Sequence, residues 1–307
     1  MKIYLAGCEM LPCLIACAAA GTVNTVLASY YSFYNPKKGT YKIRTGIEFD
    51  YTKFVDIVNG LKLGTILDSG LFSLLFGAGK DLDINDKTLE AYAETYLQFV
   101  EESKHPGYIV ECDGQMILGV EKIWEFRKQF FEKWKGNEVI YVWHVTDGEK
   151  NLDKMVERYN YIAVSVPECR IVAKTMKVSL RALVTKALDR IYSKRDDIKV
   201  HLLGNTQPRL MEFIRVESCD STSWAYPAWY KQPGYYSYDG FDLKKNDICT
   251  QQEVEKYLGE TGCLDRWQKY VERFGIETKR SREFMIKAIM NARVYGLLNQ
   301  NLEKHYG

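Results

Sequence analysis

The sequence predicts an α/β fold, a (β/α)8 barrel of the TIM type that forms one domain with a C-terminal helical extension. Eight short runs rich in Val, Ile and Tyr recur along the chain, and segments with helical spacing or caps lie between most of them. Such alternation is typical of helices packed around a parallel sheet. Eight strands in one chain of 307 residues favour a closed barrel over an open doubly wound sheet.

The expected elements follow from this alternation. The candidate strands are residues 2–7, 26–33, 65–69, 108–113, 139–145, 161–166, 199–204 and 215–221. The candidate helices are residues 87–104, 119–135, 149–158, 170–192 and 206–213, followed by a helical tail from about 250 to 304. We therefore expect a barrel domain over residues 1–248 and C-terminal helices over 249–307 that pack on the barrel, without a zinc subdomain.

The N-terminal region contains a long stretch without charge, from Met10 to Pro36. A signal peptide or a membrane span has a similar composition, but Pro12 and Gly21 divide this stretch into pieces the size of one helix and one strand. We therefore expect a buried helix followed by a buried strand. A soluble, cytoplasmic protein is predicted, in the host cytoplasm if the chain is phage-encoded, with no membrane partner.

The charge and the cysteines exclude several classes of protein. Forty-two basic and forty acidic residues give a formal charge of +2, so a nucleic-acid partner must be met by a local patch. The eight cysteines contain no CxxC pair, which favours reduced thiols. Cys13 and Cys17 lie four residues apart on one helix face, where packing is the simpler interpretation than metal binding. Gly77 and Gly79 occur without a complete phosphate-loop motif.

Three aspartates end predicted strands, and active sites of this fold gather at the C-terminal ends of the strands. They are Asp68, Asp113 and Asp220. Each one alone is equally well explained as a turn former or helix cap, but three at one rim favour a site. The other side chains and glycines expected at this rim are Ser69, Gly70, His144, Ser165, Gly204, Asn205 and Ser221.

Carboxylates that face one pocket suit chemistry at a sugar carbon. One carboxylate attacks or stabilises an oxocarbenium-like centre, while another transfers the proton of the leaving group or nucleophile. A carboxylate nucleophile needs no deprotonation near neutral pH, which favours a covalent glycosyl-enzyme intermediate with Asp220 or Asp68 as the nucleophile. His144 is open to a second interpretation, as a packing residue.

Four segments, in order, resemble the tRNA-guanine transglycosylase superfamily, and within it most closely the 7-deazaguanine DNA transglycosylases of phages and bacteria, the DpdA type. The segments are ILDSGLFS, YIVECDG, VWHVTDGEKNLDKMVERYNYIAVSV and HLLGNTQPRLMEFIRVESCDSTSW. The resemblance extends from about residue 64 to 230. It implies a barrel enzyme that exchanges a guanine base through a covalent aspartyl-nucleotide intermediate.

The resemblance also implies roles for single residues. Asp220 in SCDST matches the nucleophile, Asp68 in LDSG matches the general acid/base, and Asp113 matches the aspartate that recognises the guanine edge. His144 occupies the position of a base-contacting glutamine, and Ser165 that of a glycine-rich turn. Ser69, Gly70 and Gly204 complete the expected base-binding set.

The chain also departs from the superfamily pattern. The C-x-C-x2-C box with a later histidine, which binds structural zinc in the tRNA enzymes, is absent from the sequence. We therefore expect neither a metal nor another cofactor. In place of a basic stretch after the nucleophile, an aromatic segment contains Trp224, Trp229, Tyr230 and Lys231. These residues are predicted either to bind nucleic acid by stacking and phosphate pairing or to cover the barrel rim.

The sequence thus predicts a transferase that exchanges guanine in DNA for a 7-deazaguanine such as 7-cyano-7-deazaguanine. The target base must leave the helical stack, because its glycosidic carbon and its edge are not reachable together in a duplex. A tRNA-directed transglycosylase is the first alternative, and a non-catalytic nucleic-acid-binding subunit is the second. The expected partners are DNA, with tRNA as the alternative, and the free 7-deazaguanine base. Both a monomer and a homodimer are left open.

Overall fold

The computed structural model describes residues 1–76, 84–231, 235–239, 242–246 and 250–306. Gly77 and Gly79 of the glycine pair noted in the sequence lie outside the described residues. None of the helices in these ranges is both long and apolar enough to cross a membrane.

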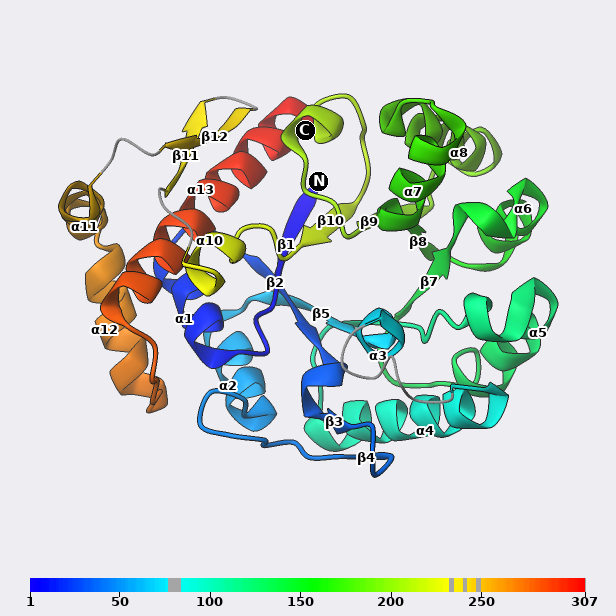
Figure 1. Ribbon diagram of the computed structural model, residues 1–307, viewed down its shortest axis with the longest axis horizontal. Coiled ribbons are helices and arrows are strands. Elements are labelled where there is room, and N and C mark those ends of the chain that lie inside the picture. Colours follow the sequence, from blue (N-terminus) through cyan, green and yellow to red (C-terminus); the bar gives the residue numbers. More distant parts are fainter. Residues whose placement is uncertain (77–83, 232–234, 240–241, 247–249, 307) are drawn as a thin grey trace. The chain divides into compact units, whose positions relative to one another are not determined.

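Eight parallel strands form a closed barrel, which confirms the predicted fold (Figure 1). Around the barrel the order is β1, β10, β9, β8, β7, β6, β5 and β2. The strands are β1 Lys2–Ala6, β2 Thr25–Ser29, β5 Gly64–Asp68, β6 Tyr108–Val110, β7 Val139–Trp143, β8 Tyr161–Ser165, β9 Lys199–Leu203 and β10 Ser218–Ser221. Each coincides with one of the eight predicted strands, because most barrel strands are short apolar runs that are largely buried. Strand β10 is buried as well but contains two serines and an aspartate.

Helices follow most of the strands, as the alternation in the sequence predicts. They are α1 Leu11–Ala20, α2 Tyr51–Leu61, α3 Leu71–Phe76, α4 Asp86–Ser103, α5 Gln115–Phe130, α6 Glu149–Arg158, α7 Val166–Met176, α8 Leu180–Lys194, α9 Pro208–Met211, α10 Tyr226–Trp229, α11 Gln251–Glu260, α12 Cys263–Phe274 and α13 Arg282–Tyr306. Two hairpins join them, β3 Tyr34–Asn35 with β4 Thr40–Tyr41, and β11 Tyr235–Asp239 with β12 Asp242–Asn246.

Several boundaries differ from the predicted ones for local reasons. The predicted helix 170–192 is two helices, because Lys177 adopts a left-handed conformation (φ 55°) that ends α7. The predicted strand 26–33 ends at Ser29, and Tyr30–Phe33 form a 3-10 turn instead. Helix α5 starts four residues earlier than predicted and is interrupted at Gly119 (φ 77°).

The chain also divides into two compact units, and each is described by itself. Unit one contains residues 1–28, 44–65 and 206–307, and unit two contains residues 29–43 and 66–205. This division does not follow the expected boundary after residue 248, since residues 206–307 belong to one unit.

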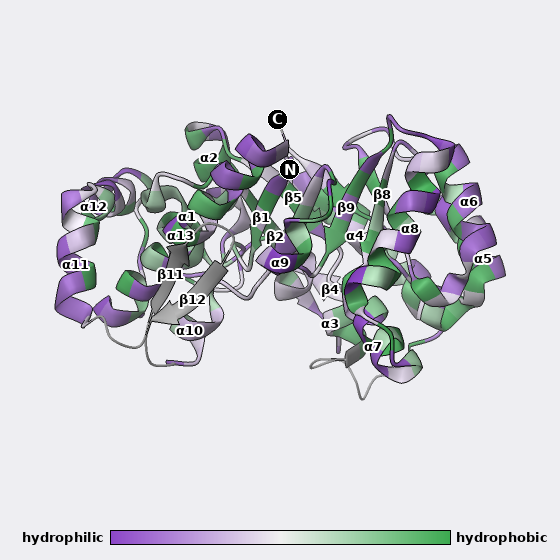
Figure 2. Ribbon diagram, turned by 90° about the horizontal axis from the view of Figure 1, so that it is seen from above, coloured by the Kyte–Doolittle hydropathy of each residue, from purple (hydrophilic) through white to green (hydrophobic). Residues whose placement is uncertain are grey.

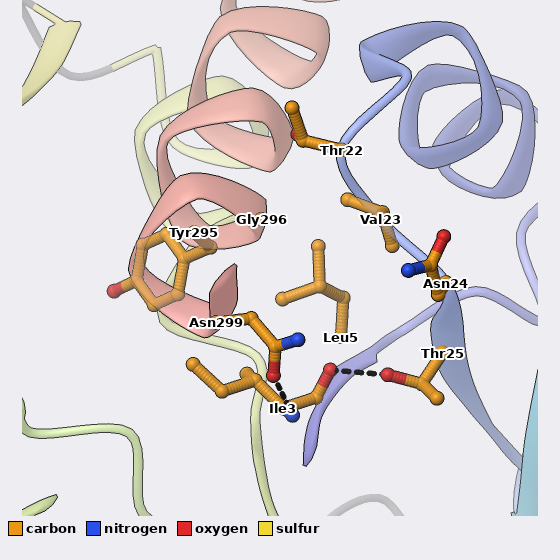
Figure 3. A pocket seen from close by; sticks show the side chains of 9 residues that line it. All are labelled: Ile3, Leu5, Thr22, Val23, Asn24, Thr25, Tyr295, Gly296 and Asn299. Atoms are coloured by element: carbon orange, nitrogen blue, oxygen red, sulfur yellow. Dashed lines mark hydrogen bonds between the residues drawn. The ribbon is translucent and has the colours of Figure 1, made fainter. Parts of the chain in front are cut away.

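The core of unit one is built around helix α1 and the C-terminal helices α12 and α13. All ten residues of α1 are buried, and the helix packs against both α12 and α13. Helix α13 is fastened to strand β1, because the Asn299 side chain accepts a hydrogen bond of 2.6 Å from the backbone N–H of Ile3 (Figure 3). The C-terminal helices of this unit therefore support the strand that lies next to β10.

The core of unit two contains a cluster of aromatic rings. Tyr30 lies 5.1–5.4 Å from the rings of Tyr92, Tyr96 and Phe99, measured between ring centroids. The barrel strands consist mostly of hydrophobic residues, whereas hydrophilic and apolar residues alternate along helices α5, α6 and α8 (Figure 2). This is the amphipathic pattern expected of helices that cover a sheet.

Candidate functional site

The C-terminal end of β5 places Asp68, Ser69 and Gly70 in a tight turn. One carboxylate oxygen of Asp68 accepts a hydrogen bond of 2.9 Å from the backbone N–H of Gly70. Gly70 has φ +71°, and a Cβ atom there would lie 2.6 Å from the Oγ of Ser29, so glycine is required. The hydroxyl of Tyr92 donates to the carbonyl of Ser69 at 2.5 Å. Helix α4 thus holds the strand end that presents Asp68.

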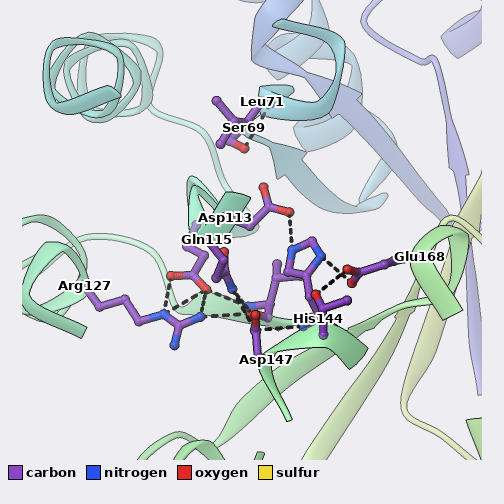
Figure 4. Close-up of polar contacts among 11 residues, drawn as sticks. Ser69, Leu71, Asp113, Gln115, Arg127, His144, Asp147 and Glu168 are labelled. Carbon is purple, nitrogen blue, oxygen red and sulfur yellow. Dashed lines mark hydrogen bonds and ion pairs between the residues drawn. The ribbon is translucent and has the colours of Figure 1, made fainter. Parts of the chain in front are cut away.

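The ends of β6, β7 and β8 bring together three ionisable side chains (Figure 4). The imidazole of His144 lies between two carboxylates, with Nε2 3.0 Å from Asp113 and Nδ1 2.9 Å from Glu168. Glu168 also accepts a hydrogen bond of 2.5 Å from the hydroxyl of Thr146. Asp113 and His144 were predicted site residues, whereas Glu168, in the first turn of α7, was not.

This arrangement determines the charge of the imidazole. Burial by itself would lower the pKa of His144, but the hydrogen bonds and charges of Asp113 and Glu168 outweigh it and raise the pKa to about 10. Burial would raise the pKa of Glu168, yet hydrogen bonds from His144 and Thr146 keep it below its usual value. At neutral pH His144 is therefore an imidazolium, and both of its ring nitrogens donate, one to Asp113 and one to Glu168.

A second set of buried contacts fixes the backbone beneath His144. The side chain of Asp147 accepts from the backbone N–H of His144 at 3.1 Å and from Gln115 at 3.4 Å. Arg127 forms a bidentate ion pair with Glu111, and both side chains are at most 2% exposed. Glu111 also accepts from the backbone N–H of Val142, which joins the end of β6 to β7. Rigid support of this kind limits the positions that His144 can occupy.

Asp68 and Asp113 lie close to the same buried thiol. Burial raises the pKa of Cys112 well above its usual value, and the charges of Asp113 and Asp68 raise it further. The carboxylates that follow β5 and β6 therefore both act electrostatically on Cys112.

The ends of β8 and β9 are held close to each other. Ser165 is the last residue of β8, is buried, and stands opposite Leu203 in the strand register. Gly204 has φ +69°, and a Cβ atom there would lie 2.8 Å from Pro167, so the approach of α7 requires glycine. The next residue, Asn205, is 1% exposed, and neither its amide nitrogen nor its amide oxygen has a hydrogen-bond partner among the described residues. A buried amide of this kind is costly, which is typical of groups that serve binding.

Asp220 belongs to unit one, at the C-terminal end of β10. It is 6% exposed and stands opposite Tyr4 of β1 in the strand register. The hydroxyls of Ser221 and Ser223 lie 2.7 Å apart directly after it. The expectation that Asp220 and Asp68 serve one reaction stays a prediction.

The aromatic segment after Asp220 contains both buried and exposed rings. Trp224 is fully buried, and its indole N–H donates to the carbonyl of Ala6 at 2.9 Å. This is a correction to the expectation that Trp224 binds nucleic acid, because a base has no access to a fully buried ring. Trp229 is partly exposed and packs against Gly7, while Tyr230 (68% exposed) and Lys231 are on the surface.

In the described ranges of the chain, no group of three or more His, Cys, Asp or Glu side chains has an arrangement that suits a metal ion. The ionisable cluster of unit two contains only His144 and two carboxylates, and the imidazole nitrogens are both used by those carboxylates. The described site residues therefore offer acid, base and hydrogen-bonding chemistry.

The comparisons with known proteins give a structural neighbour. The chain is similar to the crystal structure of tryptophan synthase subunit alpha from Legionella pneumophila str. Paris, at 11% sequence identity and a TM-score of 0.42. The alignment covers 89% of this chain and 92% of that chain. No family model matches the sequence, and no curated protein matches it.

Proposed function

We propose that the protein is a transglycosylase that exchanges guanine in DNA for a 7-deazaguanine base. The observation that carries the proposal is the carboxylate of Asp113, which is held at the end of β6 by the protonated ring of His144. A fixed carboxylate accepts hydrogen bonds from neighbouring N–H donors, and a guanine edge presents its ring N–H and its amino group side by side. Glu168 acts as a positioning residue, because it touches His144 and holds the ring toward Asp113.

The resemblance of the quoted segments supports the roles of the other aspartates. Asp220 attacks C1′ of the nucleotide, and the C1′–N9 bond breaks as guanine leaves with a proton from Asp68. The carboxylate of Asp68 then removes the N9 proton of the incoming 7-deazaguanine. N9 attacks C1′, the bond between C1′ and Asp220 breaks, and the nucleophile is regenerated. The DNA backbone remains uncut throughout.

The proposal is tested by trapping the covalent intermediate on a denaturing gel. Purified protein is incubated with labelled DNA while free guanine is removed, and a protein–DNA adduct is expected. Asp220→Asn removes the nucleophile and should abolish the adduct. Asp68→Asn should lower the rate of base exchange by roughly 10²–10⁴-fold, the usual contribution of a general acid or base.

The matched control is Asp189→Asn, because Asp189 is an exposed aspartate on α8. It should leave both the adduct and the exchange rate unchanged. An adduct that persists in Asp220→Asn would exclude Asp220 as the nucleophile. An adduct with tRNA and none with DNA would replace DNA by tRNA as the substrate.

A further inference from the structure

A cavity of about 370 Å³ lies within unit one, and all of its lining residues belong to that unit. It is formed between the end of α10 and the segment that leads into α13, two elements that pack against each other (Figure 1). Its volume is in the range of cavities that bind small ligands or parts of larger ones, roughly 300–1,000 Å³.

The cavity has a strong excess of positive charge. Its lining includes the four cationic side chains of Lys231, Lys279, Arg280 and Lys287 and a single carboxylate, that of Glu283. The lining therefore carries three more positive than negative charges, whereas the whole chain carries a formal charge of +2. A local concentration of this kind attracts anions even when the overall field is weak.

Two of the cations are held in place by carboxylates. Lys287 is 5% exposed, and its ammonium lies 2.8 Å from the half-exposed carboxylate of Glu283. Arg280 lies 3.0 Å from Glu48 and stacks 5.2 Å above the ring of Phe284. These contacts fix both cationic groups before a ligand arrives, which reduces the entropy lost on binding.

The remaining two cations have no carboxylate contact described above and are exposed. Lys231 and Lys279 are both exposed at the edge of the cavity. Lys287 lowers the pKa of Glu283, and the charge of Lys231 lowers it further, so Lys231 also lies near this carboxylate. An incoming anion would therefore meet the exposed ammonium groups of Lys231 and Lys279 and the two cations that are paired with carboxylates.

Exposed aromatic rings adjoin the cavity in sequence and in space. Tyr230 directly precedes Lys231 and is 68% exposed, and Tyr226 is 43% exposed with its ring centroid 5.6 Å from that of Tyr230. Trp229 lines the cavity, and its ring centroid lies 6.0 Å from that of Tyr226. Aromatic rings beside a cationic groove are the combination by which proteins bind single-stranded nucleic acid.

We infer that this cavity binds a backbone phosphate of single-stranded or unstacked DNA, with Tyr226 and Tyr230 stacking on a neighbouring base. The inference rests on the proposed function for its choice of DNA as the polymer. It groups Lys279, Arg280 and Lys287 with Lys231 as one set of phosphate contacts.

The test measures binding of a fluorescein-labelled single-stranded DNA by anisotropy over a range of salt concentrations. The test variant is Lys231→Gln/Lys279→Gln, because both side chains are exposed and their loss leaves the buried pairs intact. For single strands, each lost phosphate contact reduces the steepness of the plot of log K against log salt by about 0.7. We expect the slope of log K against log salt to fall by about 1.4 and affinity to fall at least about tenfold.

The matched control is Lys256→Gln/Lys269→Gln, which removes the same charge from exposed positions on α11 and α12 of unit one. It should leave the slope unchanged. Equal losses in both double variants would overturn the inference, since they would show a general charge effect. A wild-type slope in the test variant would overturn it as well.

Two further arms identify the source of the phosphate. A DNA with neutral methylphosphonate linkages should bind the wild-type protein and the test variant equally weakly. Inorganic phosphate should compete with DNA no better than chloride at equal ionic strength. Selective competition by millimolar phosphate would instead assign the cavity to a small phosphorylated ligand and overturn the choice of DNA.

The outcomes separate this inference from the proposed function. If the test variant exchanges bases with an unchanged KM for DNA, DNA binding in the cavity is refuted while the proposed transglycosylase activity stands. If the test variant loses salt-dependent DNA binding but no form of the protein exchanges bases, the proposed transglycosylase activity is refuted while DNA binding in the cavity is supported.

Discussion

Replacement of His144 by glutamine is expected to remove a large, pH-dependent part of the stability. The folded pKa of His144 is raised to about 10, whereas an unfolded histidine titrates near 6.5. A group with a raised folded pKa stabilises the protein fully below its unfolded pKa, and this stabilisation is lost as the pH rises through the folded pKa. pH 7 lies about three pH units below the folded pKa of His144. The protonated imidazole therefore contributes about 4 kcal/mol to the free energy of unfolding at pH 7.

The assay is urea denaturation of the wild-type protein and His144→Gln at pH 7 and pH 10.5. The wild-type protein should lose about 4 kcal/mol more of its free energy of unfolding between these values than the variant does. Other groups titrate over the same interval, but they are common to both proteins and cancel in the comparison.

NMR titration checks the charge itself, because the chain has four histidines. His144 should remain protonated on both nitrogens at pH 8, while buried His105, whose pKa is lowered to about 4, should be neutral. A His144 that titrates near 6.5, or a difference in unfolding below about 1 kcal/mol, would refute the reasoning.

Three further predictions concern the same unit. Glu168→Gln should lower the pKa of His144 in NMR titration and weaken base exchange by raising the KM for the free 7-deazaguanine base. The pKa of Glu168 is itself lowered in the folded protein, so the ionised carboxylate stabilises the fold, and this stabilisation should disappear as the pH falls below about 4.5. If wild type and Glu168→Gln lose the same free energy of unfolding at acidic pH in urea denaturation, this prediction is wrong. Arg127→Leu should cost about 3–5 kcal/mol in urea denaturation, because the buried charge of Glu111 loses its partner; a loss below 1 kcal/mol would show that the pair is not buried in solution. Asn205→Leu should raise the free energy of unfolding by about 1 kcal/mol or more, since it removes two unpartnered buried atoms, and should lower base exchange; a lower melting temperature would show that the amide is satisfied.

The fold follows from the sequence because most of the barrel strands are short, apolar and bounded by turn residues. All eight were predicted within a few residues, and helix α6 at Glu149–Arg158 was predicted at its observed bounds. Helix α2 was not predicted, although Asp50 caps it by accepting from the backbone N–H of Lys53. The split between α7 and α8 depends on a left-handed lysine, and lysine has no sequence preference for that conformation.

The candidate site was predictable only in part. Asp113 and His144 were expected because each follows an apolar strand, and unit two brings them within hydrogen-bonding distance. Glu168 lies 24 residues beyond His144, so no local spacing connects them. Asn205 was noted at a strand end, where an asparagine is indistinguishable from a turn residue until its burial is known.

The aromatic segment shows a second limit. Trp224 and Tyr230 are six residues apart in one aromatic run, yet the first is fully buried and the second is 68% exposed. The composition of the run indicates both packing and stacking, and only the path of the chain assigns each ring to one of them. The cationic cavity was not expected either, because Lys231 and Lys287 are far apart in the sequence.

The most direct test of the proposed function is nucleoside mass spectrometry after incubation of the protein with 7-cyano-7-deazaguanine and either DNA or unmodified tRNA. We predict a modified deoxynucleoside in the DNA with the wild-type protein and none with Asp220→Asn. Modified nucleoside in the tRNA alone, or in neither polymer, would contradict the account.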